Sequence, residues 1–188
     1  MNVREAALDT LIKIEQGGAY STIAVNDALK QKKVAPKDVG LYTELVYGTL
    51  SRKGTLDYIL NDRIRSPKKL DKFVLPLLRM SVYQLFYLDK VPDRAVLHEA
   101  VEIAKKRGHH LGTSKFVNGV LRNVLREGFP DFSELTDAER ISIEHSHPEW
   151  LVSDWIELYG VETAEAICQL NNEPAPVTVR VNRKRASV

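Results

Sequence analysis

The sequence predicts an all-α protein. Apolar residues recur at three- and four-residue spacing through residues 1–127, which is the pattern of amphipathic helices that share a core. Nothing in that region alternates apolar and polar residues as a half-buried strand does. Glycines and prolines interrupt the pattern at intervals that suit short helices. We therefore expect a helical bundle over residues 1–128.

Start and stop signals place the first helices of this bundle. A first helix should end at Gly17-Gly18, and Ser21 is expected to cap a second. Pro36 should open a third helix, because proline is tolerated in a first helical turn. A break is expected at Gly54-Thr55, followed by a fourth helix that runs to about Ile64.

The stretch Leu70–Leu88 is apolar on nearly every side, so it should be the central, buried helix. Pro76 should either begin its regular part or kink it. After Val91-Pro92 an amphipathic helix should run to Gly108, and a last helix should span about Ser114–Glu127.

The remaining residues differ in character from the bundle. Residues 129–147 are expected to form an acidic linker with about one helical turn near 139–144. Residues 148–173 should form connector helices, in which Trp150 and Trp155 anchor the segment on the bundle or on a following domain. Within residues 174–188, alternating apolar residues at 177, 179 and 181 are the one strand signature of the chain. We expect that strand to begin a further domain that is truncated here.

Charge follows the same division. Residues 1–130 carry 22 Lys and Arg against 14 Asp and Glu, whereas residues 131–173 carry one Arg against 11 acids. A basic surface favours a polyanion partner, because neutralised phosphates release counterions. A solvated basic face that binds nothing explains the same excess equally well.

Several classes of function are disfavoured. No apolar run approaches the roughly 18 residues that span a bilayer, and the first residues lack a signal-peptide pattern, so we expect a cytoplasmic protein with no membrane contact. Cys168 is the only cysteine, has no basic neighbour, and should pack in a core rather than act as a nucleophile. No carboxylate or cysteine stands at metal-ligand spacing in the sequence from His109-His110, so we expect no metal.

Three segments carry a resemblance to a known family. They are Arg79–Leu85 (RMSVYQL), Val96–Lys105 (VLHEAVEIAK) and Lys115–Arg122 (KFVNGVLR). In order and spacing they resemble the NusB family, whose members are helical and bind RNA in transcription antitermination. The resemblance covers about residues 1–128. One interpretation is therefore a NusB-type antitermination factor.

A second set of residues extends the resemblance beyond that family. Ser146–Leu151 (SHPEWL), Tyr159-Gly160, Cys168, Asn171–Glu173 and Val179–Asn182 resemble the segment that precedes the catalytic domain in RsmB-type small-subunit rRNA methyltransferases. The two resemblances together imply an all-α, NusB-like helical bundle, then a short helical connector, then the first strand of a truncated next domain.

The methyltransferase resemblance also implies chemistry that these residues do not carry. Such enzymes transfer a methyl group from S-adenosylmethionine to carbon 5 of a cytosine in 16S rRNA. The sequence has no G-x-G-x-x-G turn and no Pro-Cys pair, so we expect the catalytic domain to lie beyond Val188 and to be a partner in cis. This chain alone should bind no cofactor and methylate nothing.

The resemblance also implies where RNA would bind. NusB proteins place RNA contacts near the pair that matches Lys115 and Phe116, and a basic cluster precedes it at the turn into the last helix, whose N-terminus attracts phosphate. The candidate RNA-binding residues are Arg4, Lys105, Lys106, Arg107, Lys115, Phe116, Asn118, Arg122, Arg126, Arg180 and Arg183.

Other roles remain open for several of these residues. The basic cluster could be merely solvated or could contact the catalytic domain. Phe116 could be a core residue, and Asn118-Gly119 could serve close helix packing and capping.

Overall fold

The computed structural model describes residues 2–64, 70–176, 178–182 and 184–185. Within these residues the chain forms ten α-helices, one 3₁₀ helix and no strand, so the all-α prediction is confirmed. The elements are α1 (Val3–Gly17), α2 (Ser21–Lys30), η1 (Pro36–Asp38), α3 (Val39–Ser51), α4 (Lys53–Asn61), α5 (Val74–Tyr87), α6 (Asp93–Arg107), α7 (Leu111–Glu127), α8 (Asp137–His145), α9 (Glu149–Tyr159) and α10 (Val161–Asn171). None of the described helices combines the length and the apolarity that crossing a bilayer requires.

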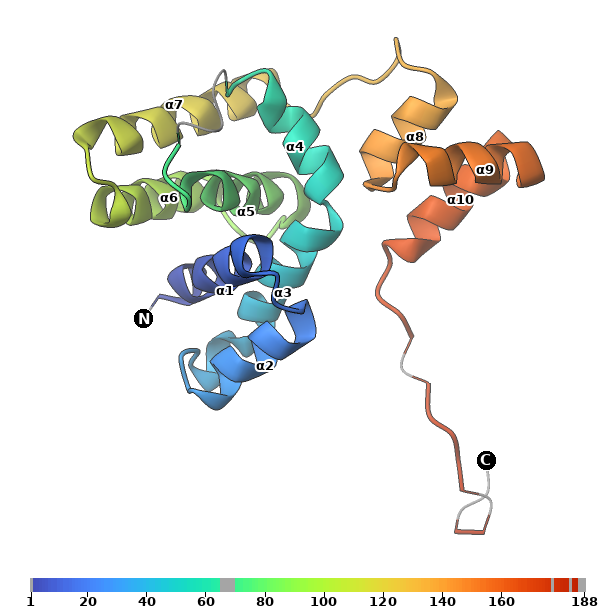
Figure 1. Cartoon of the computed structure of the whole chain (residues 1–188), viewed down its shortest axis with the longest axis horizontal. Helices are drawn as coiled ribbons and strands as arrows, with labels where there is room; N and C mark the ends of the chain where they lie inside the picture. The colour runs from blue at the N-terminus through green and yellow to red at the C-terminus, as the bar shows by residue number, and fades with distance from the viewer. Residues whose placement is uncertain (1, 65–69, 177, 183, 186–188) are drawn as a thin grey trace.

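The helices form two groups (Figure 1). Helices α1–α7 make the bundle, in which α5 contacts α1, α3, α4, α6 and α7. Helices α8–α10 pack on one another as a smaller unit, hereafter the connector, and α8 lies against α4. The residues after α10 lead away from both groups.

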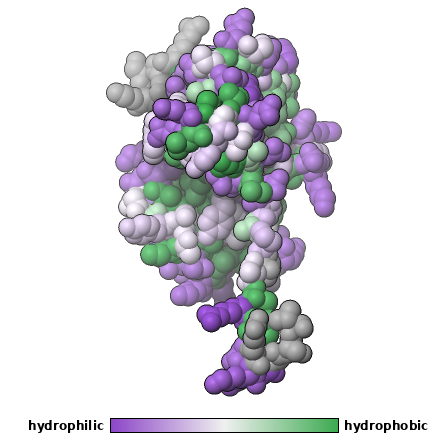
Figure 2. Space-filling view, turned by 90° about the vertical axis from the view of Figure 1, so that its right-hand side faces the viewer, coloured by the Kyte–Doolittle hydropathy of each residue, from purple (hydrophilic) through white to green (hydrophobic). Residues whose placement is uncertain are grey.

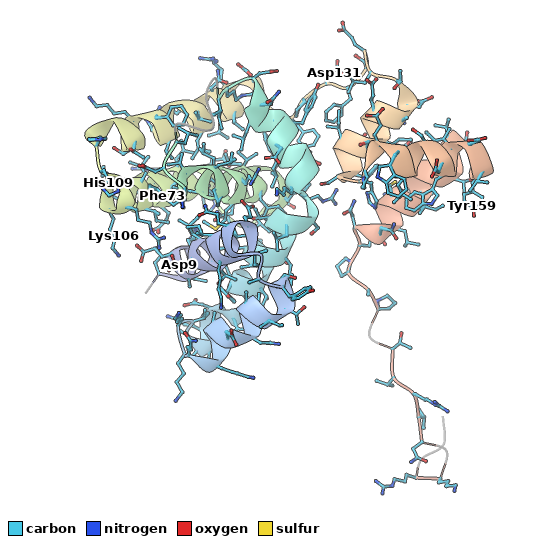
Figure 3. All side chains as sticks on the ribbon, viewed as in Figure 1. Asp9, Phe73, Lys106, His109, Asp131 and Tyr159 are labelled. Atoms are coloured by element: carbon cyan, nitrogen blue, oxygen red, sulfur yellow. The ribbon has the colours of Figure 1, made fainter. Side chains whose placement is uncertain are left out.

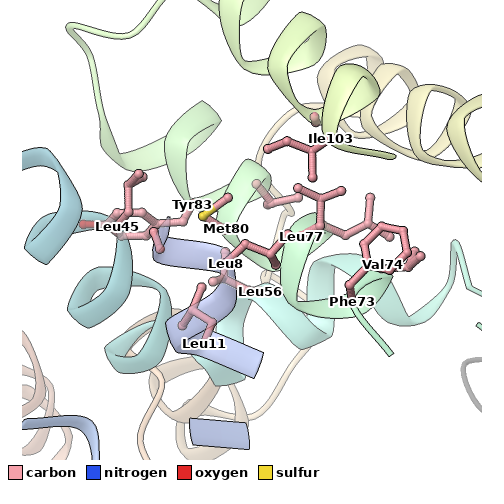
Figure 4. Close-up of a cluster of buried hydrophobic side chains, with 14 of the residues drawn as sticks. Leu8, Leu11, Leu45, Leu56, Phe73, Val74, Leu77, Met80, Tyr83 and Ile103 are labelled. Carbon is pink, nitrogen blue, oxygen red and sulfur yellow. The ribbon is translucent and has the colours of Figure 1, made fainter. Parts of the chain in front are cut away.

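The bundle core surrounds α5, as the sequence predicts. Leu77 and Met80 of α5 meet Leu8 and Leu56, and all four are at most 1% exposed (Figure 4). Burial of this size removes apolar surface from water on every side of the helix, which explains why its sequence has no polar face. Pro76 is the third residue of α5, which begins at Val74, and in this first turn a missing N–H breaks no hydrogen bond within the helix.

Three predicted helix boundaries are wrong by a few residues. Ser21 is the first residue of α2 rather than its cap, and Tyr20 takes the cap position with extended backbone. Pro36 forms the short η1, and α3 begins at Val39. The last bundle helix begins at Leu111, three residues before the predicted start, because His110 is the extended residue that precedes the first turn.

The predicted break at Gly54-Thr55 is wrong for a tertiary reason. The chain turns at Arg52, and both residues lie inside α4. The Gly54 N–H donates to Ser146 Oγ at 2.7 Å, and Thr55 Oγ1 donates to the Ile143 carbonyl at 2.5 Å. These bonds fasten the start of α4 to the end of α8. The first turn of a helix has free N–H groups, and here the connector accepts one of them.

The acidic segment is more ordered than the sequence predicts. Residues 137–145 form α8, which begins with a capping box between Thr136 and Glu139. Ile141 of α8 is fully buried with Val152 of α9 and Cys168 of α10. The prediction that Cys168 packs in a core is confirmed, and burial raises the pKa of its thiol.

The two tryptophans of the connector behave differently. Trp155 packs beside the small core of Ile141, Val152 and Cys168. Trp150 is 68% exposed, so it does not anchor the connector on the bundle, and its contact with a following domain stays a prediction. The turn of the helix explains this, because Val152 and Ile156 occupy the inward face of α9.

The predicted strand is not formed in the residues described. Residues 178–182 are irregular, and Val177 lies outside the described residues. A strand needs a neighbour to pair its backbone groups, and the described part of the chain provides none. Val179 is accordingly 75% exposed.

Candidate nucleic-acid interface

The basic cluster at the end of α6 is engaged with acids of the bundle. Lys106 Nζ lies 2.8 Å from Glu5 Oε1, and Arg107 Nη1 lies 2.7 Å from Asp9 Oδ1. Glu5 is buried, and the hydrogen bond from Lys106 holds the pKa of its carboxyl below the usual value. Figure 3 shows Lys106, near the end of α6, on the same side of the bundle as Asp9 of α1. These two cations therefore fasten α6 to α1, in addition to any contact with RNA.

A basic stripe runs along the outer face of α7. Lys115, Arg122 and Arg126 are exposed, and their spacing of seven and four residues puts them on one side of the helix. Arg122 Nε donates to Asn118 Oδ1 at 3.2 Å, which orients the guanidinium along that side. Among the residues that the structure describes, no acid lies within 4.0 Å of Lys115 or Arg122.

A matching stripe on α6 completes a groove. Arg94, His98 and Lys105 are exposed at spacings of four and seven residues, and they line a cavity of about 600 Å³ together with Asn118 and Arg122 of α7. Its floor is aliphatic and partly buried, formed by Leu97, Val101 and Leu125. We call this the α6–α7 groove. The one acid in its lining, Glu102, is held by Lys105 Nζ at 2.6 Å.

Two of the groove's basic residues were not predicted from the sequence. Arg94 and His98 lie four residues apart on α6, and Lys105 follows seven residues later. This stripe was visible as a helical repeat of basic residues. What the repeat alone does not give is its position beside the α7 stripe, because that depends on how α6 and α7 are rotated against each other.

The other predicted residues lie away from the groove. Arg4 is half-buried and its Nε donates to Gln84 Oε1 at 2.7 Å. Phe116 packs against the bundle core and borders a different cleft, between α7 and α4. Arg180 is exposed after α10, and Arg183 lies outside the described residues.

Gly119 does not serve the close helix packing that the sequence suggested. It lies in the middle of α7, and a Cβ added there would meet no heavy atom within 4 Å. The glycine next to Asn118 is therefore not required by a neighbouring helix.

The connector holds the one acid–histidine group of metal-ligand type among the described residues. Glu144, His145 and Glu165 each offer a ligand atom within 4.8 Å of the others. Both oxygens of Glu165 already accept hydrogen bonds from Arg140, at 2.6 and 2.7 Å. Arg140 keeps the pKa of Glu165 below its usual value, and burial lowers the pKa of His145. The group is therefore built around a guanidinium, which supplies the positive charge that an ion would bring.

Comparison with known proteins identifies the family to which the chain belongs. Residues 1–126 match the family model for the NusB family. The chain belongs to the NusB family. Residues 147–188 match a second family model, described as Methyltr_RsmF/B-like, ferredoxin-like domain. The resemblances predicted from the sequence are confirmed, and in the predicted order.

Relatives carry the same two segments. The chain is 50% identical over 186 residues to the probable ribosomal RNA small subunit methyltransferase B of Bacillus subtilis. The aligned region covers 98% of this chain and 41% of that protein. The chain is 32% identical over 194 residues to the protein of that name in Synechocystis, and 34% identical over 191 residues to the ribosomal RNA small subunit methyltransferase B of Pseudomonas putida. The chain spans about two fifths of the length of these curated relatives.

Proposed function

We propose that this chain is the RNA-binding N-terminal region of an S-adenosylmethionine-dependent rRNA (cytosine-5) methyltransferase, and that it helps hold 16S rRNA for a catalytic domain further along the protein. The observation that carries the proposal is the order of the two family matches, a NusB bundle followed by the methyltransferase-associated segment. S-adenosylmethionine would bind in that further domain, and the 188 residues alone are inactive. The protein works in the cytoplasm, where rRNA is modified.

Within the bundle, the α6–α7 groove is the proposed RNA surface. Arg94, Lys105 and Arg122 stand on both sides of an aliphatic floor. Cations placed along both walls of a groove can follow the phosphates of a single strand, while bases rest on apolar surface. Arg126 and Lys115 extend the same charge along α7.

A charge reversal in the groove tests this proposal. The Arg94→Glu/Arg122→Glu variant should bind small-subunit rRNA fragments about tenfold to a hundredfold more weakly, and each lost phosphate contact should reduce the salt slope by about 0.7 for a single strand. Lys30→Glu/Lys37→Glu changes the net charge equally at exposed positions on α2 and η1, and should have a smaller effect. An equal loss of RNA affinity in both variants would show that the RNA is attracted only by the overall charge of the protein and not by the groove.

The cluster at the end of α6 needs a different control. Removing Lys105, Lys106 and Arg107 together would also remove the ion pairs to Glu5 and Asp9, so weaker RNA binding could reflect a shifted α1. Lys105→Ala alone removes a groove cation whose partner, Glu102, is on the same helix. Lys105→Ala should weaken RNA binding without lowering the melting temperature.

The role in methylation is tested in the full-length protein. The Arg94→Glu/Arg122→Glu change should lower 5-methylcytidine in 16S rRNA while binding of S-adenosylmethionine is unchanged. A NusB-type antitermination factor is the alternative function, and it would leave 5-methylcytidine unaffected when the gene is deleted.

A further inference from the structure

A second cleft lies on the flank of α7 that faces α4, next to the basic stripe. Its walls come from α4, α7 and residues 128–131, and its volume is about 770 Å³. Three aromatic residues line it: Tyr58, Phe116 and Phe129. Tyr58 and Phe129 are 39% and 43% exposed, so each presents part of a ring to the cleft. Both rings pack against Phe132, which fixes their orientation.

The charge of this aromatic cleft is negative, unlike that of the rest of the bundle. Its lining includes Asp62, Glu127 and Asp131 against one cation, Arg63. Arg63 is fully occupied, since its Nε donates to Asn123 Oδ1 at 2.8 Å and its other nitrogens bond Glu127 and the Ile59 carbonyl. Within the described part of the chain, no cation pairs with Asp62 or Asp131, and both are exposed. Asp62 and Asp131 therefore favour a cation over a phosphate in this cleft.

Gly119 gives an independent sign of a ligand. It lines the cleft from the middle of α7, where glycine costs about 1 kcal/mol relative to alanine. A Cβ at this position would meet nothing in the protein within 4 Å. The fold therefore does not need the glycine. Its missing side chain lets another backbone come close to α7, which is a use of glycine at binding surfaces.

We propose that the aromatic cleft binds an extended polypeptide segment of a partner protein that carries arginine or lysine. A guanidinium or ammonium over an aromatic ring gains electrostatic energy, and a nearby carboxylate adds a charge-assisted hydrogen bond. Tyr58, Phe116 and Phe129 supply the rings, Asp62 and Asp131 supply the carboxylates, and Gly119 makes room for the peptide backbone. Asp131 lies at the opposite end of the bundle from Lys106 (Figure 3).

Peptide binding tests the proposal directly. The probe is a short fluorescein-labelled peptide in which arginines alternate with neutral residues, and its twin carries citrulline in place of arginine. Fluorescence anisotropy with the whole chain should show binding of the arginine peptide. The citrulline twin, which has no positive charge, should bind at least about tenfold more weakly. This corresponds to a loss of about 1.4 kcal/mol in binding free energy.

Variants then locate the site. Asp62→Lys should weaken peptide binding about tenfold. Gly119→Ala should raise the melting temperature, because alanine favours the helix, and yet weaken peptide binding. Tyr58→Phe should retain binding and Tyr58→Ser should lose it, since the ring and not the hydroxyl faces the cation. None of these changes should weaken RNA binding at the α6–α7 groove, so the two proposals can fail separately.

The acidic connector is the natural rival site for a basic peptide. Asp154→Lys makes the same charge change as Asp62→Lys at an exposed position of α9. Asp154→Lys should leave peptide affinity nearly unchanged. If it weakens binding as much as Asp62→Lys does, the attraction is diffuse and the proposal is overturned. Full peptide affinity in both Asp62→Lys and Gly119→Ala would overturn it as well.

Discussion

The bundle and the connector are held together by different forces. The bundle has one large apolar core around α5, with Arg79 buried between Asp57 and Glu15 at its edge. The connector has four fully buried residues, Ile141, Val152, Ala164 and Cys168, which is too small a core to carry it alone. An ion pair between Arg140 and Glu165 adds a polar link between α8 and α10, and the connector's face toward solvent mixes apolar and polar patches (Figure 2).

The comparison shows that the connector depends on its neighbours. Its ion pairs are partly exposed, so each contributes little by itself. Its bonds to α4 and its exposed Trp150, Leu158, Tyr159 and Leu170 indicate a unit whose surface is not fully covered. Both tryptophans of the chain lie in α9, so tryptophan fluorescence follows the connector while circular dichroism follows the whole chain.

The largest effect is expected in the bundle, at Gly48→Ala. A Cβ at Gly48 would overlap the ring of Tyr83, whose hydroxyl donates to Glu44 and which therefore cannot move freely. We expect a loss of about 3 kcal/mol in the free energy of unfolding, measured by urea denaturation. Gly40→Ala, in the same helix but with open space at its Cβ, should not destabilise. Similar behaviour of the two variants would contradict the tight packing at Gly48.

Arg140→Met should act on the connector alone. Arg140 joins α8 to α10 through both oxygens of Glu165 and also contacts Glu144. Removing it leaves neighbouring carboxylates unpaired, and we expect about 1–2 kcal/mol of lost connector stability after allowing for solvent screening. Tryptophan fluorescence should report the transition at lower urea, while the circular dichroism of the bundle transition keeps its midpoint. A common shift of both transitions would show that the two units unfold together.

Acid should loosen the connector through the same group. His145 has a lowered pKa because burial disfavours its charged form, so stability is lost as the pH falls below the usual value of 6.5. The pKa of Glu165 is lowered by Arg140, so its contribution is present above 4.5 and is lost as the pH falls through its folded value. Urea unfolding followed by tryptophan fluorescence should show a lower midpoint once the pH falls below 6.5, and a further decrease once it falls below 4.5. His145→Gln should remove the first step and keep the second.

A smaller effect is expected where the two units meet, at Gly54→Ala. A Cβ at Gly54 would lie 2.9 Å from Ser146 Oγ, so either this hydroxyl rotates or the end of α8 shifts, and both changes disturb its hydrogen bond with the Gly54 N–H. Alanine also favours the helix itself, so overall stability should change by less than about 1 kcal/mol. Hydrogen exchange should rise at residues 143–146, and Ser146→Ala should produce the same change. Unaltered exchange in both variants would remove this hydrogen bond as the link between the units.

The smallest effect is expected at Trp150→Ser. The side chain is 68% exposed, and exposed substitutions change stability by about 0.5 kcal/mol or less. Trp155→Ser, at the small core, should destabilise the connector clearly more. Urea denaturation of both variants, followed by circular dichroism, makes the comparison. An equal loss of stability in both variants would indicate that Trp150 does anchor the connector within this chain.

Sequence by itself determined the helices and what they bury. The lack of a polar face identified α5 as the central helix, and the apolar face of its own helix identified Cys168 as a core residue. The charge division between bundle and connector was equally readable, since it is a property of composition. The four-residue spacing of Arg122 and Arg126 likewise puts them on one side of a helix.

Tertiary structure decided which residues of different helices meet. It paired Lys106 and Arg107 with acids of α1, brought Arg94 and His98 beside Arg122, and used Gly54 to seat the connector. It also left Trp150 in solvent. The spacing within a helix fixes a face, but the rotation and offset between two packed helices depend on every side chain at their contact, and no local pattern encodes them.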